Sequence, residues 1–144
     1  MKSVRTMVII ANDRVARLLE NAGAGEGLTE IKAMEESSAV GFADFPGRSQ
    51  ATGGEARHGF ERPTSEEEHA RDLFAAEILE TVGKLWTDGG YDRLVMAAAP
   101  KMLGVLRGKL AGPLEGALSG DLNKDLTHVS VHDLPAHFAD LAEF

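Results

Sequence analysis

The sequence contains no cysteine, and this absence excludes a whole class of chemistry. Disulfide bonds, thiolate metal sites and cysteine nucleophiles all require a thiol group, and a chain without cysteine suits a reducing compartment. No run approaches the roughly 18 consecutive apolar residues that indicate a membrane-spanning helix. The apolar run 7–11 is also too short for the core of a secretory signal peptide. We therefore expect a cytoplasmic protein that has no contact with a membrane.

Positive charge is also scarce. The chain has 15 Lys and Arg residues against 23 Asp and Glu residues, which gives a formal net charge of −8. A negative field repels polyanions at long range, so we expect no DNA partner, and contact with RNA would require a local basic patch. The 144 residues and the 43% apolar content are typical of one domain that buries about two thirds of its unfolded surface.

The first third of the chain has the pattern of an antiparallel meander. Residues 6–11 (TMVIIA) form a continuous β-branched apolar run, which predicts a central strand buried on both faces. Residues 12–14 (NDR) favour a turn, so residues 15–20 are expected to return beside the first strand as a hairpin. After a glycine-rich connection, residues 28–34 predict a third, more polar strand at an edge of the sheet.

Regular patterns stop between residues 37 and 64, where five glycines and two prolines occur. A segment of this length is uncommon in a compact domain unless it is functional or disordered, so we predict a long flexible loop. Between Gly41 and Thr64 three arginines balance three acids, and three phenylalanines could stack on bases or pack on the core. The loop is therefore the predicted contact for RNA, a ribosome or a protein partner. Its candidate binding residues are Arg48, Gly53, Gly54, Glu55, Arg57 and His58.

A long helix is predicted after this loop. Ser65 and Glu68 have the spacing of a capping box, which marks a helix start. Apolar residues then recur at three- and four-residue steps, which predicts one buried stripe over about 20 residues. The stripe consists of Ala70, Leu73, Phe74, Ile78, Val82, Leu85 and Trp86. Residues 88–90 (DGG) are expected to end the helix.

The last third of the sequence predicts two more strands and two more helices. Residues 93–99 (RLVMAAA) are typical of an interior parallel strand that is reached through a helical crossover. Pro100 suits the first turn of a helix over residues 100–110. Residues 114–122 are a weak strand candidate, and Asp133 is expected to cap a last helix. The apolar stripe of that helix consists of Leu134, Phe138 and Leu141.

These elements follow the order β-β-β-α-β-α-β-α, which predicts an α/β fold. We expect a single domain over residues 1–144 with a five-stranded mixed sheet and helices on both faces. Ribonuclease H-like domains and the central domain of class I eukaryotic and archaeal release factors share this order. A ribonuclease H-like nuclease holds two Mg²⁺ ions with carboxylates on the first strand, first helix and fourth strand. Here Ile9 or Ile10 and Ala98 or Ala99 take the strand positions, and only Glu77 could serve, so no two-metal nuclease is predicted.

A crevice is expected where the second helix begins at the end of the fourth strand. Backbone N–H groups at such a place often bind anions, and Lys101 and Arg107 are the anion-binding candidates. An enzymatic alternative is therefore a hydrolase that acts on a phosphorylated or ester substrate at Ala99–Lys101. A third alternative is an oligomeric interaction subunit without a pocket.

Three of the five histidines lie close together near the end of the chain. In an extended segment His128, Ser130 and His132 would share one face. Two such histidines with a carboxylate could bind Zn²⁺ or Ni²⁺, which makes His128 and His132 weak metal candidates. Asp133 is better used as a helix cap, and we expect neither a metal nor a cofactor.

Four segments taken together resemble a known family. They are VIIANDRVARLLE (8–20), Gly47-Arg48, AAAPKMLGVLRGKL (97–110) and NKDLTHVSVHDLPAHF (123–138), and their spacing matches over nearly the whole chain. The resemblance is to the bacterial host-attachment protein family, described as required for attachment to host cells. That family is similar to the central domain of class I release factors, in which a long loop carries a Gly-Gly-Gln tip.

The resemblance implies a binding domain without catalysis. The loop of this chain has Gly53-Gly54-Glu55 where release factors have Gly-Gly-Gln. A neutral amide both donates and accepts hydrogen bonds, whereas an ionised carboxylate only accepts them. We therefore expect no peptidyl-tRNA hydrolysis and no catalytic residue. Attachment to host cells would then be an indirect result of binding a partner.

Overall fold

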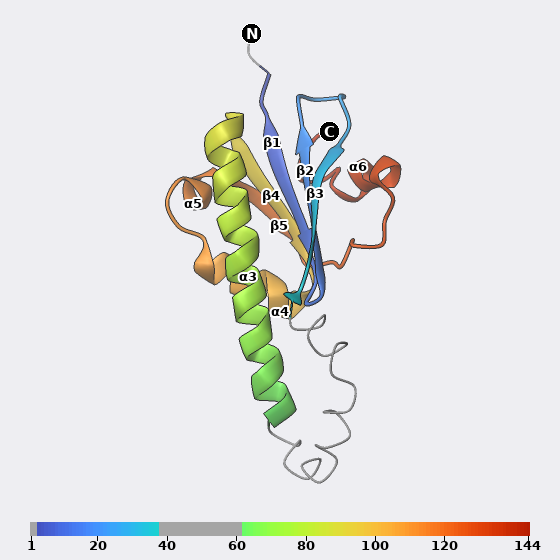
Figure 1. Ribbon diagram of the computed structural model, residues 1–144. Coiled ribbons are helices and arrows are strands. Elements are labelled where there is room, and N and C mark those ends of the chain that lie inside the picture. The colour runs from blue at the N-terminus through green and yellow to red at the C-terminus, as the bar shows by residue number, and fades with distance from the viewer. Residues whose placement is uncertain (1–2, 38–61) are drawn as a thin grey trace.

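Five strands form one mixed sheet in the order β3-β2-β1-β4-β5 (Figure 1). The computed structural model describes residues 3–37 and 62–144. The strands are β1 (Thr6–Ala11), β2 (Val15–Asn21), β3 (Thr29–Glu35), β4 (Arg93–Ala98) and β5 (Leu118–Leu122). β1 pairs antiparallel with β2, and β2 with β3, whereas β1, β4 and β5 run parallel. The predicted α/β fold with a five-stranded mixed sheet is confirmed.

The central position of β1 follows from its apolar sequence. All six residues are buried, because β1 has a neighbouring strand at each edge and a packed layer on each face. The turn to β2 is fixed by Asn12, whose Oδ1 accepts hydrogen bonds from the backbone N–H groups of Arg14 (2.8 Å) and Val15 (2.9 Å). β3 lies at the edge of the sheet and is mostly exposed, as its polar sequence predicted.

Two helices pack against one face of the sheet. They are α3 (Arg62–Gly89) and α4 (Pro100–Lys109), and a short helix, α5 (Pro113–Ala117), follows α4. The 28 residues of α3 span about 42 Å at the usual rise per residue. Figure 1 shows its amino-terminal end extending past the sheet, and residues 65–69 are all exposed. No helix in the described ranges is both long enough and apolar enough to cross a bilayer.

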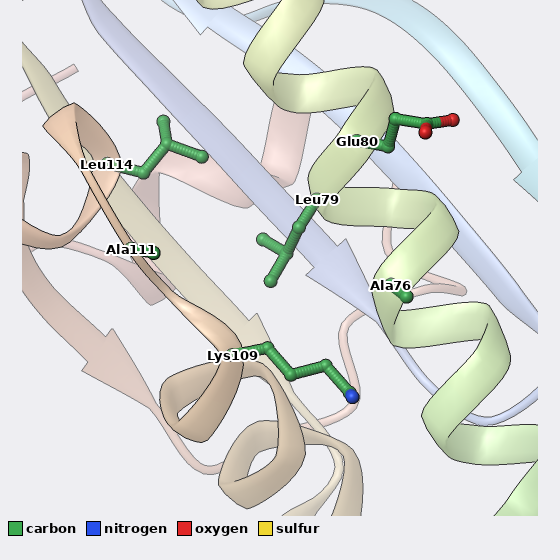
Figure 2. Close-up of a pocket in the computed structure, with 6 residues that line it drawn as sticks. All are labelled: Ala76, Leu79, Glu80, Lys109, Ala111 and Leu114. Carbon is green, nitrogen blue, oxygen red and sulfur yellow. The ribbon is translucent and has the colours of Figure 1, made fainter.

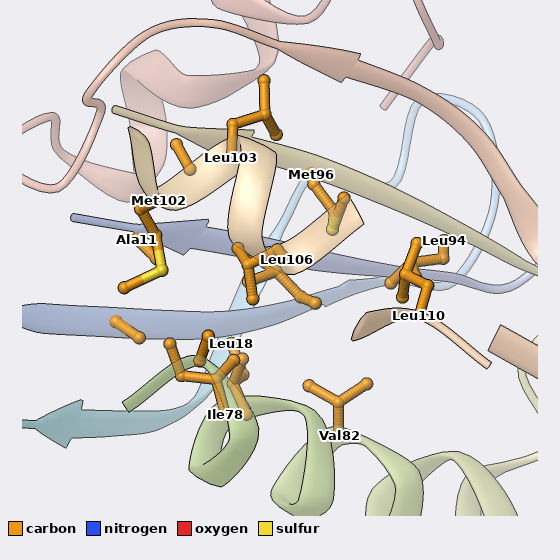
Figure 3. Packing of buried hydrophobic residues seen from close by; sticks show 14 of the residues in the cluster. Ala11, Leu18, Ile78, Val82, Leu94, Met96, Met102, Leu103, Leu106 and Leu110 are labelled. Carbon is orange, nitrogen blue, oxygen red and sulfur yellow. The ribbon is translucent and has the colours of Figure 1, made fainter. Parts of the chain in front are cut away.

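The side chains of β1 point alternately into two separate cores. Met7, Ile9 and Ala11 pack with α3 and α4, and Figure 3 shows how side chains from the strands and from both helices meet in this first core. Val8 and Ile10 pack on the other face, against a segment that contains the 3-10 turn η2 (Val131–Asp133) and α6 (Leu134–His137). This segment contributes Leu126, Leu134, Phe138, Ala142 and Phe144 to the second core. Helices therefore cover both faces of the sheet, as predicted.

The helix α3 begins four residues earlier than the capping-box prediction, with Ser65 as the cap, placed it. Its first residue is Arg62, because Pro63 suits a first helical turn, where its fixed φ is favourable and its missing N–H has no partner to lose. Ser65 therefore lies inside the helix and is not its cap. The predicted loop over residues 37–64 is accordingly too long at its carboxyl end. Its main part, residues 38–61, lies outside the described residues.

Three other local predictions need correction. Leu73 was expected in the buried stripe of α3 but is 59% exposed, because it lies on the side of the helix away from the sheet. The start of the predicted strand over residues 114–122 forms the helix α5 instead, since Pro113 opens a helical turn. Asp133 already has a helical backbone and makes no side-chain cap. The cap of this turn is Ser130, whose Oγ accepts a hydrogen bond from the Asp133 N–H at 3.3 Å.

A polar cluster lies at the end of the sheet where β4 begins. The Tyr91 hydroxyl donates a hydrogen bond to Glu20 Oε1 (2.5 Å), and Arg5 Nη2 donates to the same oxygen (3.0 Å). The Arg5 guanidinium also lies over the Tyr91 ring, with its Cζ 4.6 Å from the ring centroid. Burial, followed by the hydrogen bond to Glu20, raises the pKa of Tyr91 from 10.0 to about 12.

We expect the Tyr91 phenol to titrate with a midpoint near 12. Because Tyr91 is the only tyrosine of the chain, the ultraviolet absorbance of the phenolate reports on this residue alone. A raised pKa favours the protonated phenol in the folded state. The resulting stability is complete below pH 10 and is lost as the pH rises toward 12. Glu20→Gln is expected to lower the midpoint, and a midpoint near 10 in the unchanged folded protein would contradict the cluster.

Candidate functional site

Several of the sequence-predicted residues lie at the end of the sheet where β1 and β4 reach their carboxyl ends. We call this end of the sheet the carboxyl edge. Ala11 is the partner of Ala98 in the parallel ladder, and the Ala99 N–H donates a hydrogen bond to the Ala11 carbonyl at 3.2 Å. The helix α4 begins directly afterwards, at Pro100. In open α/β sheets ligands bind in the crevice outside the carboxyl ends of the strands. This edge is therefore a candidate site by its position.

The first turn of α4 has backbone N–H groups without a side-chain cap, because Ala99 occupies the cap position. Lys101 is exposed in this turn. Arg107 lies in the last turn, about 9 Å further along the helix axis, where its Nε and Nη2 donate hydrogen bonds to Asp121 at 2.8 and 2.5 Å. The hydrogen bond to Asp121 raises the pKa of Arg107. The helix therefore does not bring the two anion-binding candidates together.

An ion pair joins the β1–β2 turn to α3. Arg71 Nε donates hydrogen bonds to both carboxylate oxygens of Asp13 (3.1 Å each), and Nη2 donates to Oδ2 (2.9 Å). The Arg71 side chain is 8% exposed and the Asp13 side chain 42%. The hydrogen bond to Asp13 raises the pKa of Arg71, so the guanidinium stays charged. The local sequence predicts only a turn at Asp13, because the partner of Asp13 lies 58 positions away.

A second network joins the same turn to the carboxyl-terminal segment. Asn12 Nδ2 donates hydrogen bonds to Asp125 Oδ2 (3.0 Å) and Thr127 Oγ1 (3.1 Å), and Thr127 donates to Asp125 Oδ1 through its N–H (3.0 Å) and its hydroxyl (2.6 Å). Burial alone would raise the pKa of Asp125, but the hydrogen bonds from Thr127 and Asn12 outweigh it and hold the pKa below its ordinary value. Arg17 Nη1 adds a hydrogen bond to the Val129 carbonyl at 2.6 Å. These polar groups therefore fix the backbone of the segment on the sheet.

Both sides of the predicted loop are anchored at this turn. After β3, the buried Glu36 donates a hydrogen bond from its N–H to the Arg14 carbonyl (2.7 Å). On the other side, α3 is fixed through Arg71 and Asp13. The candidate residues Arg48, Gly53, Gly54, Glu55, Arg57 and His58 themselves lie outside the described residues. The chain thus leaves β3 at the carboxyl edge and returns through a helix that is held at the same edge.

The weak metal candidates do not form a cluster. His128 and His132 are exposed, and the expected extended segment is not present, because η2 begins at Val131. Within residues 3–37 and 62–144, no three His, Asp or Glu side chains converge closely enough to hold a metal ion. The positions on β1 and β4 that a two-metal nuclease would fill with carboxylates are occupied by the buried Ile9 and Ala98.

An apolar groove that the sequence pattern did not predict lies between α3 and the connection from α4 to α5 (Figure 2). Its volume is about 320 Å³, and its lining residues are Ala76, Leu79, Glu80, Lys109, Ala111 and Leu114. Figure 2 shows the side chains of Leu79 and Lys109 pointing into the space between the two walls, whereas the Glu80 carboxylate points away from it. Ala76 and Leu79 fall beside the predicted stripe of α3. The sequence signal that could have indicated the groove was an apolar face of α3 that is wider than the predicted stripe.

Two comparisons with known proteins give a match, one to a solved structure and one to a family model. No curated protein matches the sequence. Among solved structures, the archaeal translation termination factor aRF1 superposes with a TM-score of 0.48 at 11% sequence identity, over 94% of this chain and 38% of that factor. The family model described as "Protein required for attachment to host cells" matches residues 7–138, which confirms the resemblance carried by the four segments. This chain therefore belongs to the family of proteins required for attachment to host cells.

Proposed function

We propose that this domain is a non-catalytic binding module and that residues 41–64 contact RNA on the ribosome. The charge of this segment is the observation that carries the proposal. Its three arginines and three acids make it neutral within a chain of net charge −8. A polyanion would therefore meet less repulsion here than over the rest of the domain. The three phenylalanines of the segment offer faces on which unpaired bases can stack.

The polar residues at the carboxyl edge support a role in holding this segment rather than in catalysis. Asp13 is engaged by Arg71 through three hydrogen bonds. Asp125 accepts hydrogen bonds from Asn12 and Thr127. Carboxylates held in this way fix the backbone of the turn and of the carboxyl-terminal segment. They give the segment 41–64 a rigid base from which to contact a partner.

Co-sedimentation with purified bacterial ribosomes at near-physiological salt tests the proposal. The full chain is expected to pellet with the ribosomes, and a variant lacking Ser49–Gly59 is expected to stay in the supernatant. The double variant Arg48→Glu with Arg57→Glu should weaken binding about tenfold or more, because two charge-assisted contacts to phosphate become repulsive. Circular dichroism checks that both variants remain folded.

A matched double variant controls for net charge. Lys32→Glu with Lys124→Glu makes the same change in charge at two exposed positions outside the segment, and it should pellet like the unchanged protein. An equal loss of binding in both double variants would mean that binding follows net charge and not the segment. Failure of the folded full chain to pellet would overturn the contact with RNA and leave a protein partner as the ligand of this segment.

A further inference from the structure

The apolar groove beside α3 is a second candidate site, separate from residues 41–64. Four of its six lining residues are apolar. Its volume of about 320 Å³ lies near the lower end of the range for small-molecule sites, about 300–1,000 Å³. A protein interface of ordinary size, in contrast, covers about 20–30 residues on each partner. The dimensions of the groove therefore suit a small molecule better than the surface of another protein.

One cation lies in this otherwise apolar lining. Figure 2 shows the side chain of Lys109 pointing into the space between the two walls, whereas the Glu80 carboxylate points away from it. Arg107, in the same turn of α4, is already paired with Asp121. Lys109 takes part in none of the ion pairs found in the described part of the chain. The charge that faces the groove is therefore a single ammonium group.

The charged and apolar parts of the groove are separated along its length. Figure 2 shows Lys109 at one end and Leu114 at the other, with the side chain of Leu79 between the two walls. Lys109, Ala111 and Leu114 also follow one another along the chain on one wall. A ligand with a negative group at one end and an apolar chain at the other matches this arrangement.

We propose that this groove binds a small amphipathic anion, namely a free carboxylate with an unbranched alkyl chain. The carboxylate would accept a hydrogen bond from Lys109 Nζ, which the opposite charges strengthen. The alkyl chain would extend past Ala111 toward Leu114, in contact with Leu79. Each methylene group that becomes buried there would tighten binding about fourfold.

The negative charge of the whole chain does not forbid this ligand. The net charge of −8 repels anions at long range. At about 0.15 M salt, however, exposed charges more than about 8 Å apart are largely screened from each other. The charge nearest to the bound head group then decides which sign of ligand is preferred, and in the lining that charge belongs to Lys109.

Three related probes test the two parts of the site. Octanoate has both parts, octylammonium has the same chain with a positive head, and butyrate has the same head on a shorter chain. Two-dimensional NMR spectra of the labelled full chain report binding, at ligand concentrations below those that form micelles. Octanoate is expected to bind saturably, with a Kd on the order of 1 mM, and to shift the amide signals of Leu79, Lys109 and Ala111 most. Octylammonium and butyrate should each bind at least about tenfold more weakly.

Two matched pairs of variants locate the site. Lys109→Met keeps the apolar stem but removes the charge, so it should weaken octanoate binding about tenfold. Lys124→Met makes the same change outside the groove and should leave binding unchanged. Ala76→Gln places a polar side chain in the groove and should also weaken binding about tenfold, whereas Ala136→Gln on α6 should not. All four positions are exposed, so the domain should remain folded.

The variant that lacks Ser49–Gly59 separates this proposal from the proposed contact with the ribosome. It should bind octanoate normally, even where it no longer pellets with ribosomes. Absence of saturable shifts at the groove, equal binding of octanoate and octylammonium, or an equal loss in the two lysine variants would overturn the binding of an amphipathic anion. Sedimentation of the protein as a dimer that Ala76→Gln converts to monomers would also overturn it, because a second copy would then occupy the groove.

Discussion

Phe138→Ala is expected to lower the free energy of unfolding by about 3–5 kcal/mol. Phe138 is fully buried in the second core, where its ring makes an edge-to-face contact with Phe144 at a centroid distance of 5.5 Å. Removal of the ring leaves a cavity, because Val8 and Ile10 on the other side are held in the central strand and cannot move to fill it. Urea denaturation followed by circular dichroism measures the change.

Leu73→Ala is the matched control for this prediction. It also removes an apolar side chain, but one that is 59% exposed, so the free energy of unfolding should change by no more than about 0.5 kcal/mol. The comparison separates loss of packing from loss of hydrophobicity. A cost below about 1 kcal/mol for Phe138→Ala would contradict the close packing of the carboxyl-terminal segment on the sheet.

Removal of Asp13 is expected to lower the free energy of unfolding more than removal of its ion-pair partner Arg71. Asp13→Ala leaves a guanidinium that is only 8% exposed without its carboxylate, which should cost about 3 kcal/mol. Arg71→Met should cost less, about 1–2 kcal/mol. The remaining carboxylate is 42% exposed and can be hydrated, and the methionine retains much of the apolar packing of the arginine stem.

The two single variants and the double variant form a thermodynamic cycle. The double variant should cost less than the sum of the single variants by about 1–2 kcal/mol, because the unpaired guanidinium is then absent. Lys84→Met, on the exposed side of the same helix, is the control and should change stability little. Equal costs for Asp13→Ala and Arg71→Met would show that the burial of the guanidinium does not decide the effect.

The sheet could be predicted because its central strands have a strong local signal. The continuous apolar runs of β1 and β4 are long enough to require burial on both faces. The polar sequence of β3 correctly placed it at an edge. Crossovers between parallel strands are right-handed and connections between elements are short, so few orders of the strands remain possible. The fold class follows from these few elements, and errors at the ends of α3 and β5 do not affect it.

The candidate surfaces could not be predicted in the same way, because they depend on residues far apart in the sequence. Asp13 and Arg71 are 58 positions apart, and Asn12 and Asp125 are 113 apart. Nothing in the local pattern around Asp13 distinguishes an ordinary turn residue from one that anchors a helix. The groove likewise needs two walls from different helices. Periodicity describes one helix at a time and says nothing about the space between two of them.

During synthesis, the central strand β1 is made long before β4, the strand that pairs with its second edge. It pairs with β2 within the first 21 residues, but its other edge pairs with β4, where Thr6 faces Arg93. At about 5–20 residues per second, several seconds separate the appearance of these two strands. During that interval the nascent chain exposes one unpaired edge of its most apolar strand, which is a template for association with other chains. The yield of folded protein should therefore depend on translation speed and on chaperones that shield residues 6–11 until β4 has emerged.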